Sequence, residues 1–186
     1  MRALVTGSTL AIVVAVAAAQ APASAQTKTV GNLIQVMRGS LFRDANIIFD
    51  VQQTDPGAPV KPHKTGEGES TTSRFSNVYV GWQVVENAAV MLDESVDVML
   101  KPRLCANGIA VPVGQADYRK AAQGLRTVAR DILRAAQAKD RDKVNDLAGT
   151  LSEACASCHQ IYRDPEGPKG FGDTSIRCKV PAATSR

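Results

Sequence analysis

Residues 144–163 read VNDLAGTLSEACASCHQIYR, and this stretch decides the fold. Its apolar residues recur every three or four positions, a spacing typical of one face of an amphipathic helix. The stripe consists of Val144, Leu147, Ala148, Leu151 and Ala154. A polar corner at 140–142 precedes the stretch, and a run rich in Pro and Gly at 164–168 follows it. The sequence therefore predicts a helix that begins well before the first of two cysteines.

Two cysteines and a histidine near the end of this helix form the pattern Cys-x-x-Cys-His at Cys155, Cys158 and His159. On a helix, positions i, i+3 and i+4 share one face, so two thiols and an imidazole can meet one flat ligand. The pattern is the attachment signature of a c-type haem, in which two thioether bonds hold the porphyrin and the histidine binds the iron. We therefore expect one covalent haem c on Cys155 and Cys158, with His159 as an iron ligand.

Two other chemistries use a Cys-x-x-Cys pair. A thioredoxin-like pair has its first cysteine at a helix N-terminus, where the helix dipole lowers the thiol pKa. Here the cysteines lie about three turns into a helix. A structural zinc site needs four ligands, and outside the motif the chain offers His63, Cys105, Cys178 and carboxylates without a second paired spacing. Both chemistries stay open as alternatives to the haem.

The first 25 residues have the organisation of a secretory signal peptide. Arg2 supplies the positive start, residues 10–19 are apolar without charge, and Ala23-Ser24-Ala25 fits the small-x-small pattern before cleavage. The apolar run is shorter than the ~20 residues needed to span a bilayer. We expect cleavage after Ala25, a periplasmic location and a soluble mature protein without a membrane span.

Cys105 and Cys178 are left over when the motif cysteines are set aside. An even pair in an exported chain is compatible with a disulfide. Both residues lie in turn-rich segments, where the backbone can reach bridging geometry. We expect a Cys105–Cys178 disulfide, with two separate free thiols as the alternative.

The charge of the chain is mildly positive. It carries 22 Lys and Arg against 18 Asp and Glu, which gives a formal net charge of +4 with interspersed signs. A balance of this size indicates neither nucleic acid nor an anionic membrane surface as a partner.

Three further apolar stripes with helical spacing precede the motif helix. They span about 30–51, 82–99 and 115–136, and loops at about 53–75 and 101–114 separate them. The first stripe consists of Ile34, Met37, Leu41, Ala45 and Ile48, broadened by Leu33, Phe42 and Phe49. Met91 and Met99 are expected in the core, and Arg119, Arg126, Arg130 and Arg134 on a solvated face.

Four amphipathic helices without strand alternation predict an all-α fold, an antiparallel four-helix bundle with the haem attached to the last helix. We assign residues 26–163 to this cytochrome domain. We expect residues 164–186 to form an irregular C-terminal tail whose only obvious tether is Cys178.

The motif and its continuation read Cys155-Ala156-Ser157-Cys158-His159-Gln160-Ile161-Tyr162-Arg163. With four helices, a signal peptide and a motif late in the last helix, the chain resembles the cytochrome c′ family, including its low-spin, Met-ligated relatives. The resemblance covers about residues 30–163. It fails in the long second loop, in the loop with Cys105 and in the tail with Cys178.

The resemblance implies roles for individual residues. Cys155 and Cys158 become the haem attachment sites, and His159 becomes the proximal ligand. Arg163 is placed near the proximal face or a haem propionate, where a charge-assisted hydrogen bond is favourable; the alternative is a solvent-exposed arginine at a helix end. Tyr162 is expected to pack in the interior.

The sixth iron position decides the mechanism within this resemblance. Five-coordinate members place an apolar side chain over the iron and admit only small gases, whereas low-spin members place a methionine there. Met37 fits the second arrangement, because a thioether ligand raises the iron potential. Its alternative is core packing. The other candidates over the iron are Leu33, Ile34, Leu41 and, from the long loop, His63.

We therefore expect a periplasmic monohaem electron carrier with a His159 and Met37 ligated, low-spin iron, and not an enzyme. The rival is a five-coordinate haem module that binds nitric oxide or carbon monoxide. The expected partner is an unidentified redox protein, and the resemblance is compatible with a homodimer through exposed apolar faces of the first two helices. Peroxidase-like catalysis lacks a distal His and Arg pair in the sequence.

Overall fold

The computed structural model of the chain describes residues 29–59, 70–71, 78–171 and 173–179. The predicted signal peptide, its cleavage after Ala25, and His63 lie outside these residues. The regular secondary structure of the described part is helical, apart from one pair of two-residue strands and one isolated bridge. No helix within it is both long enough and apolar enough to cross a membrane.

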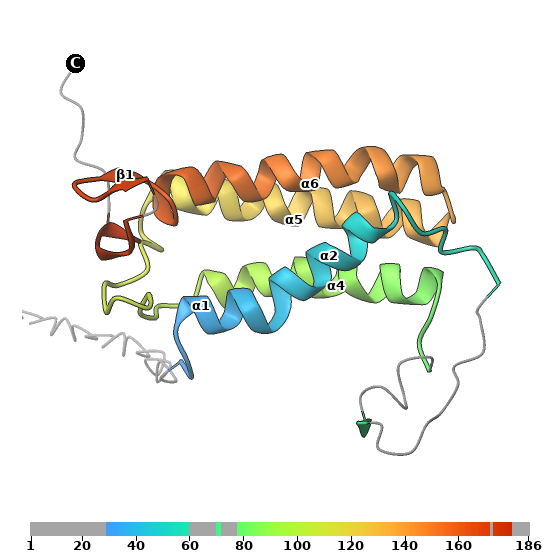
Figure 1. Cartoon of the computed structure of the whole chain (residues 1–186), viewed down its shortest axis with the longest axis horizontal. Coiled ribbons are helices and arrows are strands. Elements are labelled where there is room, and N and C mark those ends of the chain that lie inside the picture. Colours follow the sequence, from blue (N-terminus) through green and yellow to red (C-terminus); the bar gives the residue numbers. More distant parts are fainter. Residues whose placement is uncertain (1–28, 60–69, 72–77, 172, 180–186) are drawn as a thin grey trace, which may run out of the picture.

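The helices begin and end close to the predicted boundaries. The first helical run comprises α1 (Leu33–Val36), a π-helical turn η1 (Met37–Leu41) and α2 (Phe42–Asp50). It is followed by α4 (Trp82–Met99), α5 (Ala116–Gln137) and α6 (Arg141–Tyr162). Successive runs point in opposite directions in Figure 1, so the C-terminal end of α6 lies at the same end of the molecule as α1.

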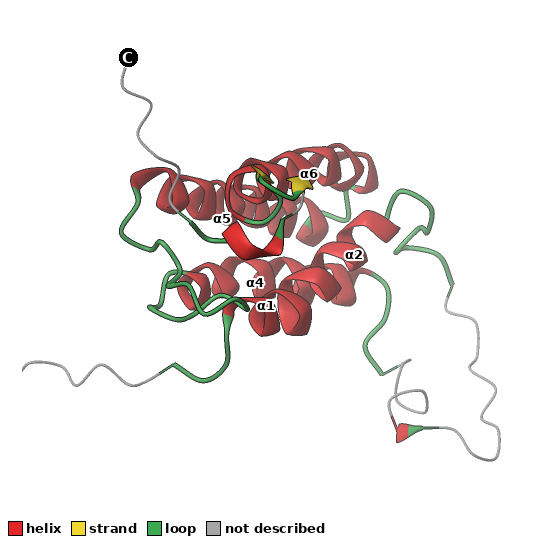
Figure 2. Cartoon of the chain, turned by 60° about the vertical axis from the view of Figure 1, so that its left-hand side comes forward, coloured by secondary structure: helices red, strands yellow, loops and turns green. Residues whose placement is uncertain are grey.

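One hydrophobic core joins these helices. α5 packs against both α4 and α6, and α2 also packs against α4 and α6, whereas α1 and η1 pack chiefly against α4. Figures 1 and 2 both show α1 beside α4. The main core contains fully buried side chains from each helical run, among them Ile48, Leu92, Ile132 and Leu151. Buried residues in each helical run therefore recur with the spacing of the predicted apolar stripes.

The π-helical turn η1 is a feature that the sequence pattern did not predict. A π turn inserts one extra residue into the α-helical repeat and rotates the following residues around the axis. Phe42, directly after the turn and predicted to broaden the buried stripe, is 68% exposed. The turn is linked to α4 by polar side chains: the Ser40 hydroxyl hydrogen-bonds buried Ser95 at 3.0 Å and donates to the buried Asp44 carboxylate at 3.0 Å.

Two expectations about side-chain burial are corrected. Met91, expected in the core, is 40% exposed on α4, although Met99 is buried as expected. Of the four arginines of α5 expected on a solvated face, Arg119, Arg130 and Arg134 are exposed as expected, whereas Arg126 is only partly exposed. Arg126 Nη2 lies 2.6 Å from Asp97 Oδ1 and Arg130 Nε lies 2.8 Å from Asp93 Oδ1, so these residues join α5 to α4.

Loops close one end of the helices, which we call the loop end. The α4–α5 loop folds back on itself through a bridge between Leu104 and Ala110. The Leu33 amide donates to the Leu104 carbonyl at 2.9 Å, which fastens this loop to the start of α1. Cys105 and Cys178 lie at disulfide-bonding distance here, with Cα atoms 6.5 Å apart.

The C-terminal segment has more structure than the irregular tail that we expected. Strands β1 (Glu166–Gly167) and β2 (Gly170–Phe171) pair, and a 3₁₀ turn η2 (Thr174–Ile176) follows. Cys178 is not its only tether. The Asn107 side chain donates to the carbonyls of Thr174 and Arg177 at 3.0 and 2.9 Å, and the Cys178 amide donates to the Tyr162 carbonyl at 2.9 Å.

Removal of the Cys105–Cys178 disulfide is expected to lower the free energy of unfolding by about 4 kcal/mol, because the bond closes a loop of 73 residues in the unfolded chain. Denaturant titration of Cys105→Ser, Cys178→Ser and the double variant checks this, and all three should lose the same amount. A thiol count on the unreduced, unfolded protein is the second measurement. Free thiols at both positions would contradict the bond.

Candidate functional site

Helix α6 carries the motif residues on its last turns. The Asp140 side chain caps the start of the helix by accepting a hydrogen bond from the Lys143 amide at 2.9 Å. At the other end, the His159 carbonyl accepts from the amides of Arg163 and Asp164 at 2.9 and 2.8 Å. The motif is therefore held in a regular helix that ends just beyond it, at the loop end of the molecule.

Cys155 and Cys158 are free thiols with little access to water. Cys155 is half-buried against the main core, and Cys158 is buried. Burial raises the pKa of the Cys155 thiol, against an opposing effect of Arg163. Burial, together with Cys155 and Asp117, raises the pKa of Cys158 to about 11. A redox-active pair needs a lowered thiol pKa, so the direction of both shifts, which follows from burial, is opposite to that of a thioredoxin-like pair.

His159 directly follows Cys158 in sequence, and its side chain is half-buried. Burial and the positive charge of Arg163 lower the pKa of its imidazole, while Asp164 opposes them. The neutral imidazole, the form that binds a metal, is therefore favoured at neutral pH. Within the described residues no group forms a hydrogen bond with this ring, so its nitrogens are not committed to another partner.

Cys158 belongs to a second apolar group, which we call the loop-end cluster. Its buried members are Cys105, Val111, Tyr118, Cys158, Tyr162 and Cys178. The rings of Tyr118 and Tyr162 meet edge to face, with centroids 5.4 Å apart. This arrangement confirms that Tyr162 packs in the interior. It also places one motif thiol beside the cysteine pair that fastens the C-terminal segment.

The Tyr162 hydroxyl is buried and has no hydrogen-bond partner within the described residues. The Asp117 carboxylate lies nearby, and the hydroxyl lowers its pKa, although the two groups do not reach the geometry of a formed hydrogen bond. Burial, and then Asp117, raise the pKa of Tyr162. The loop-end cluster thus contains a buried hydroxyl that can still donate a hydrogen bond.

Met37 opens the π-helical turn and is half-buried against the main core, on which Cys155 also packs. Outside its own helical run, the turn packs chiefly against α4. Leu33, one turn earlier, packs against both the main core and the loop-end cluster that holds Cys158. The first helical run therefore presents a thioether to the main core and an apolar side chain to the cluster that contains Cys158.

Two arginines near the motif have opposite surroundings. Arg163 is exposed and its guanidinium pairs with the neighbouring Asp164. Arg103, in the α4–α5 loop, is only 8% exposed, and its Nε and Nη1 atoms have no hydrogen-bond partner within the described residues. The sequence analysis did not single out Arg103, because its loop has no periodicity from which burial can be read. The one sequence feature that could have indicated burial of Arg103 was its position two residues before Cys105.

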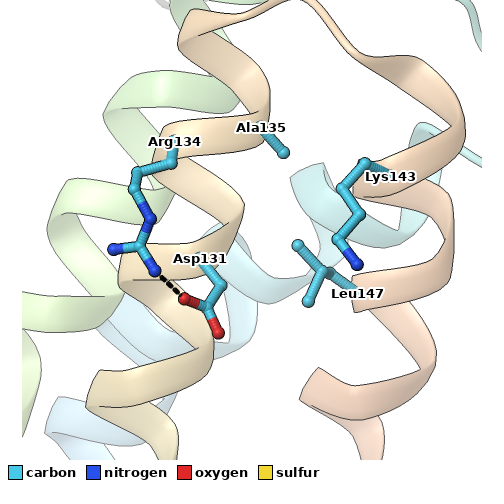
Figure 3. Close-up of a pocket in the computed structure, with 5 residues that line it drawn as sticks. All are labelled: Asp131, Arg134, Ala135, Lys143 and Leu147. Atoms are coloured by element: carbon cyan, nitrogen blue, oxygen red, sulfur yellow. Dashed lines mark hydrogen bonds and ion pairs between the residues drawn. The ribbon is translucent and has the colours of Figure 1, made fainter.

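A shallow depression lies at the other end of α5 and α6. Figure 3 shows its lining, with Asp131, Arg134 and Ala135 on one helix and Lys143 and Leu147 on the next; its volume is about 410 Å³. Arg134 pairs with Asp131 across its edge. Leu147 lies eight residues before Cys155, about 12 Å along the helix axis. This depression holds no thiol or histidine and is separate from the motif.

No three His, Cys, Asp or Glu side chains of the described residues gather so that they could hold a metal ion by themselves. The zinc alternative therefore finds no ligand set in that part of the chain. A haem iron takes four nitrogens from its porphyrin and asks the protein for only one or two ligands.

Comparisons of the chain with models of protein families, with curated proteins and with solved structures found no match. The candidate site thus stands on the free thiols of Cys155 and Cys158, the imidazole of His159, and the side chains around them.

Proposed function

We propose that this protein is a monohaem c-type cytochrome that carries electrons. One observation carries the proposal: on α6, two free thiols and an uncommitted imidazole follow each other at the i, i+3 and i+4 positions, while the other two cysteines lie at disulfide distance from each other. The four cysteines thus separate into an attachment pair and a structural pair. Disulfide formation by Cys105 and Cys178 leaves the motif thiols available.

The residues around the motif fit a haem. Cys155 and Cys158 would form the two thioethers, and His159 would give a nitrogen to the iron. The apolar loop-end cluster and the main core line the motif and suit the faces of a porphyrin. The buried Tyr162 hydroxyl supplies a hydrogen-bond donor of the kind that the polar edge of a haem can use.

A bound haem supplies the one-electron couple, and the chain sets the conditions for it. The regular end of α6 fixes the backbone position of His159 directly after Cys158, and the neutral imidazole is the form that would bind the iron. The apolar, buried surroundings of Cys158 would limit the access of water to a haem attached there. Met37 would supply the sixth ligand from the first helical run, and a thioether there favours the reduced state of the iron.

A gas-binding haem module is the second candidate function, and the position of Leu33 favours it. Leu33 packs against the cluster that contains Cys158, whereas Met37 packs only against the main core. An apolar side chain over the iron would leave its sixth position without a ligand and accessible only to small gases.

Visible spectra of the purified protein in both oxidation states separate the two functions. Electron transfer predicts a low-spin ferrous spectrum and a Met-to-iron charge-transfer band in the ferric form. Gas binding predicts a high-spin spectrum that changes on addition of carbon monoxide. Absence of any haem from a protein produced with a c-type maturation system would reject both functions.

The proposal extends to the setting of the protein. We propose an antiparallel four-helix bundle of the cytochrome c′ type with haem on its last helix, exported to the periplasm and served by a redox partner protein. Phe42 on α2 and Val90 and Met91 on α4 are exposed apolar side chains that a homodimer would cover. Sedimentation of the mature protein tests the dimer.

A further inference from the structure

Arg103 occupies an unusual position for a charged residue. Arg103 lies in the first part of the α4–α5 loop. Its carbonyl accepts a hydrogen bond at 2.9 Å from the amide of Val111, in the part of the loop that folds back. Two residues later, Cys105 ties the same loop to Cys178. The side chain is 8% exposed, so the loop holds a guanidinium inside the loop end. Arginine side chains are rarely this buried without a partner.

The hydrogen bonds of Arg103 are incomplete. Its Nη2 donates to the Val98 carbonyl at 2.8 Å, at the end of α4. Nε and Nη1 are buried without a partner, and no carboxylate of the described residues lies within ion-pair distance of the guanidinium. A buried charge that is neither paired nor fully hydrogen-bonded is strongly destabilising. Because an arginine stays charged, Arg103 has a buried positive charge and unused N–H donors, and a carboxylate would satisfy both.

Arg103 lies on the side of the loop end that holds Cys158. The Tyr118 hydroxyl donates to the Met99 carbonyl at 3.4 Å, next to the carbonyl that Arg103 uses. Tyr118 contacts Tyr162 and shares the loop-end cluster with Cys158. The pKa of Tyr118 is raised by burial and by the Cys158 thiol and lowered by Arg103, so both groups act on the same ring.

Arg163, the arginine expected from the sequence to meet a propionate, is less suited to this task. Its side chain is 55% exposed and pairs with Asp164, and the Asp164 carboxylate also lies 3.7 Å from Arg177. A pair in water contributes little, and a new anion would have to compete with Asp164. The buried guanidinium of Arg103 has no such competitor among the described residues.

We propose that Arg103 binds a propionate carboxylate of the haem attached at Cys155 and Cys158. The inference rests on the proposed function, because that function provides the carboxylate. It assigns the anion contact to the loop that Cys105 anchors, a part of the chain in which the cytochrome c′ resemblance fails.

Resonance Raman spectroscopy and redox titration of the haem-loaded protein test the contact. Arg103→Met is expected to shift the propionate bending band, because the carboxylate loses a hydrogen-bond donor. It is also expected to make one-electron reduction about tenfold less favourable, equivalent to about 59 mV, because a positive charge near the iron stabilises the reduced form. Arg103→Lys keeps the charge but loses the planar fork, so it should shift the band while leaving the potential near that of the wild type.

Arg119→Met is the matched control, since it removes an exposed arginine at the loop end, and Arg163→Met tests the rival assignment of the propionate contact to Arg163. Both are expected to leave the band unchanged. An unshifted band in both Arg103→Met and Arg103→Lys, or a shift in Arg163→Met alone, would overturn the assignment. So would a wild-type band that moves when chloride is replaced by phosphate, because a solution anion would then occupy the site.

These outcomes are distinguishable from a failure of the proposed function. If the wild-type protein carries no covalent haem, the function falls and the inference falls with it. If haem is attached and the Arg103 variants behave as the wild type, only the inference falls. If Arg103→Met does not accumulate as folded protein, Arg103→Lys still decides through its band.

Discussion

Replacement of both Cys155 and Cys158 by serine is expected to abolish covalent haem attachment completely. Serine cannot form the thioether bonds, and α6 presents no other free thiol at this position. Haem staining after denaturing electrophoresis measures the loss, since only covalently bound haem stays with the chain. Each single variant should retain one thioether at most, which leaves one vinyl group intact and moves the α band of the reduced pyridine complex to longer wavelength.

Ser157→Ala is the matched control for the cysteine variants. Ser157 lies between the two cysteines, and its exposed hydroxyl only donates to the Ala154 carbonyl of its own helix at 2.8 Å. This variant should keep full staining and the wild-type band position. Staining that persists in the double cysteine variant would show that haem is not held by these thiols and would reject the site.

Replacement of Met37 by alanine is expected to convert a low-spin, His/Met iron into a high-spin iron that binds carbon monoxide and has a lower reduction potential. The thioether is lost, and alanine offers no ligand in its place. Absorption spectra in both oxidation states, with and without carbon monoxide, measure the conversion. Met37 is only half-buried, so we expect a modest destabilisation of about 1–2 kcal/mol and a folded variant.

Two variants separate ligation from packing at this position. Met37→Leu conserves the side-chain volume but removes the sulfur, so it should give the same high-spin spectrum as Met37→Ala without the loss of stability. Met91→Ala removes an exposed methionine from α4 and should change neither spectrum nor potential. An iron that stays low-spin in both Met37 variants would reject Met37 as the ligand. A wild-type iron that is high-spin would instead select gas binding.

Much of the helical architecture could be predicted, because burial in this chain follows a regular 3.6-residue repeat. The stripe from Trp82 to Met99 was expected as one helix, and α4 has these bounds. The motif helix was expected to begin at a polar corner, and Asp140 caps it. These helices depend on local periodicity and capping, which can be recognised from residues close together in sequence.

The first helical run shows where such reading ends. No residue pattern near Met37 predicts a π turn. Within the turn, Ser40 forms a hydrogen bond with Ser95, which lies on another helix. Phe42, directly after the turn, is exposed although the apolar pattern placed it in the buried stripe. Contacts between distant segments, such as this hydrogen bond, are not contained in a one-dimensional pattern.

Of the candidate site, the sequence analysis supplied the motif residues and the Cys105 and Cys178 pair, but not their surroundings. The burial of Arg103 depends on how a loop without periodicity folds over the ends of α4 and α5. The order in the C-terminal segment depends on Asn107, some 70 residues away in sequence. Long-range contacts of this kind require the fold to be known first.

The Cys105–Cys178 disulfide also makes a covalently closed ring of chain that contains the whole of α5 and α6, and with them the motif. The exposed turn between these helices, at Lys139 with its positive φ of 57°, lies on the opposite side of that ring. A proteolytic nick there would produce two peptides joined by the disulfide, with the motif on the second. The damaged molecule would remain a single covalent species until it was reduced, so the bond confers tolerance to backbone cleavage as well as stability.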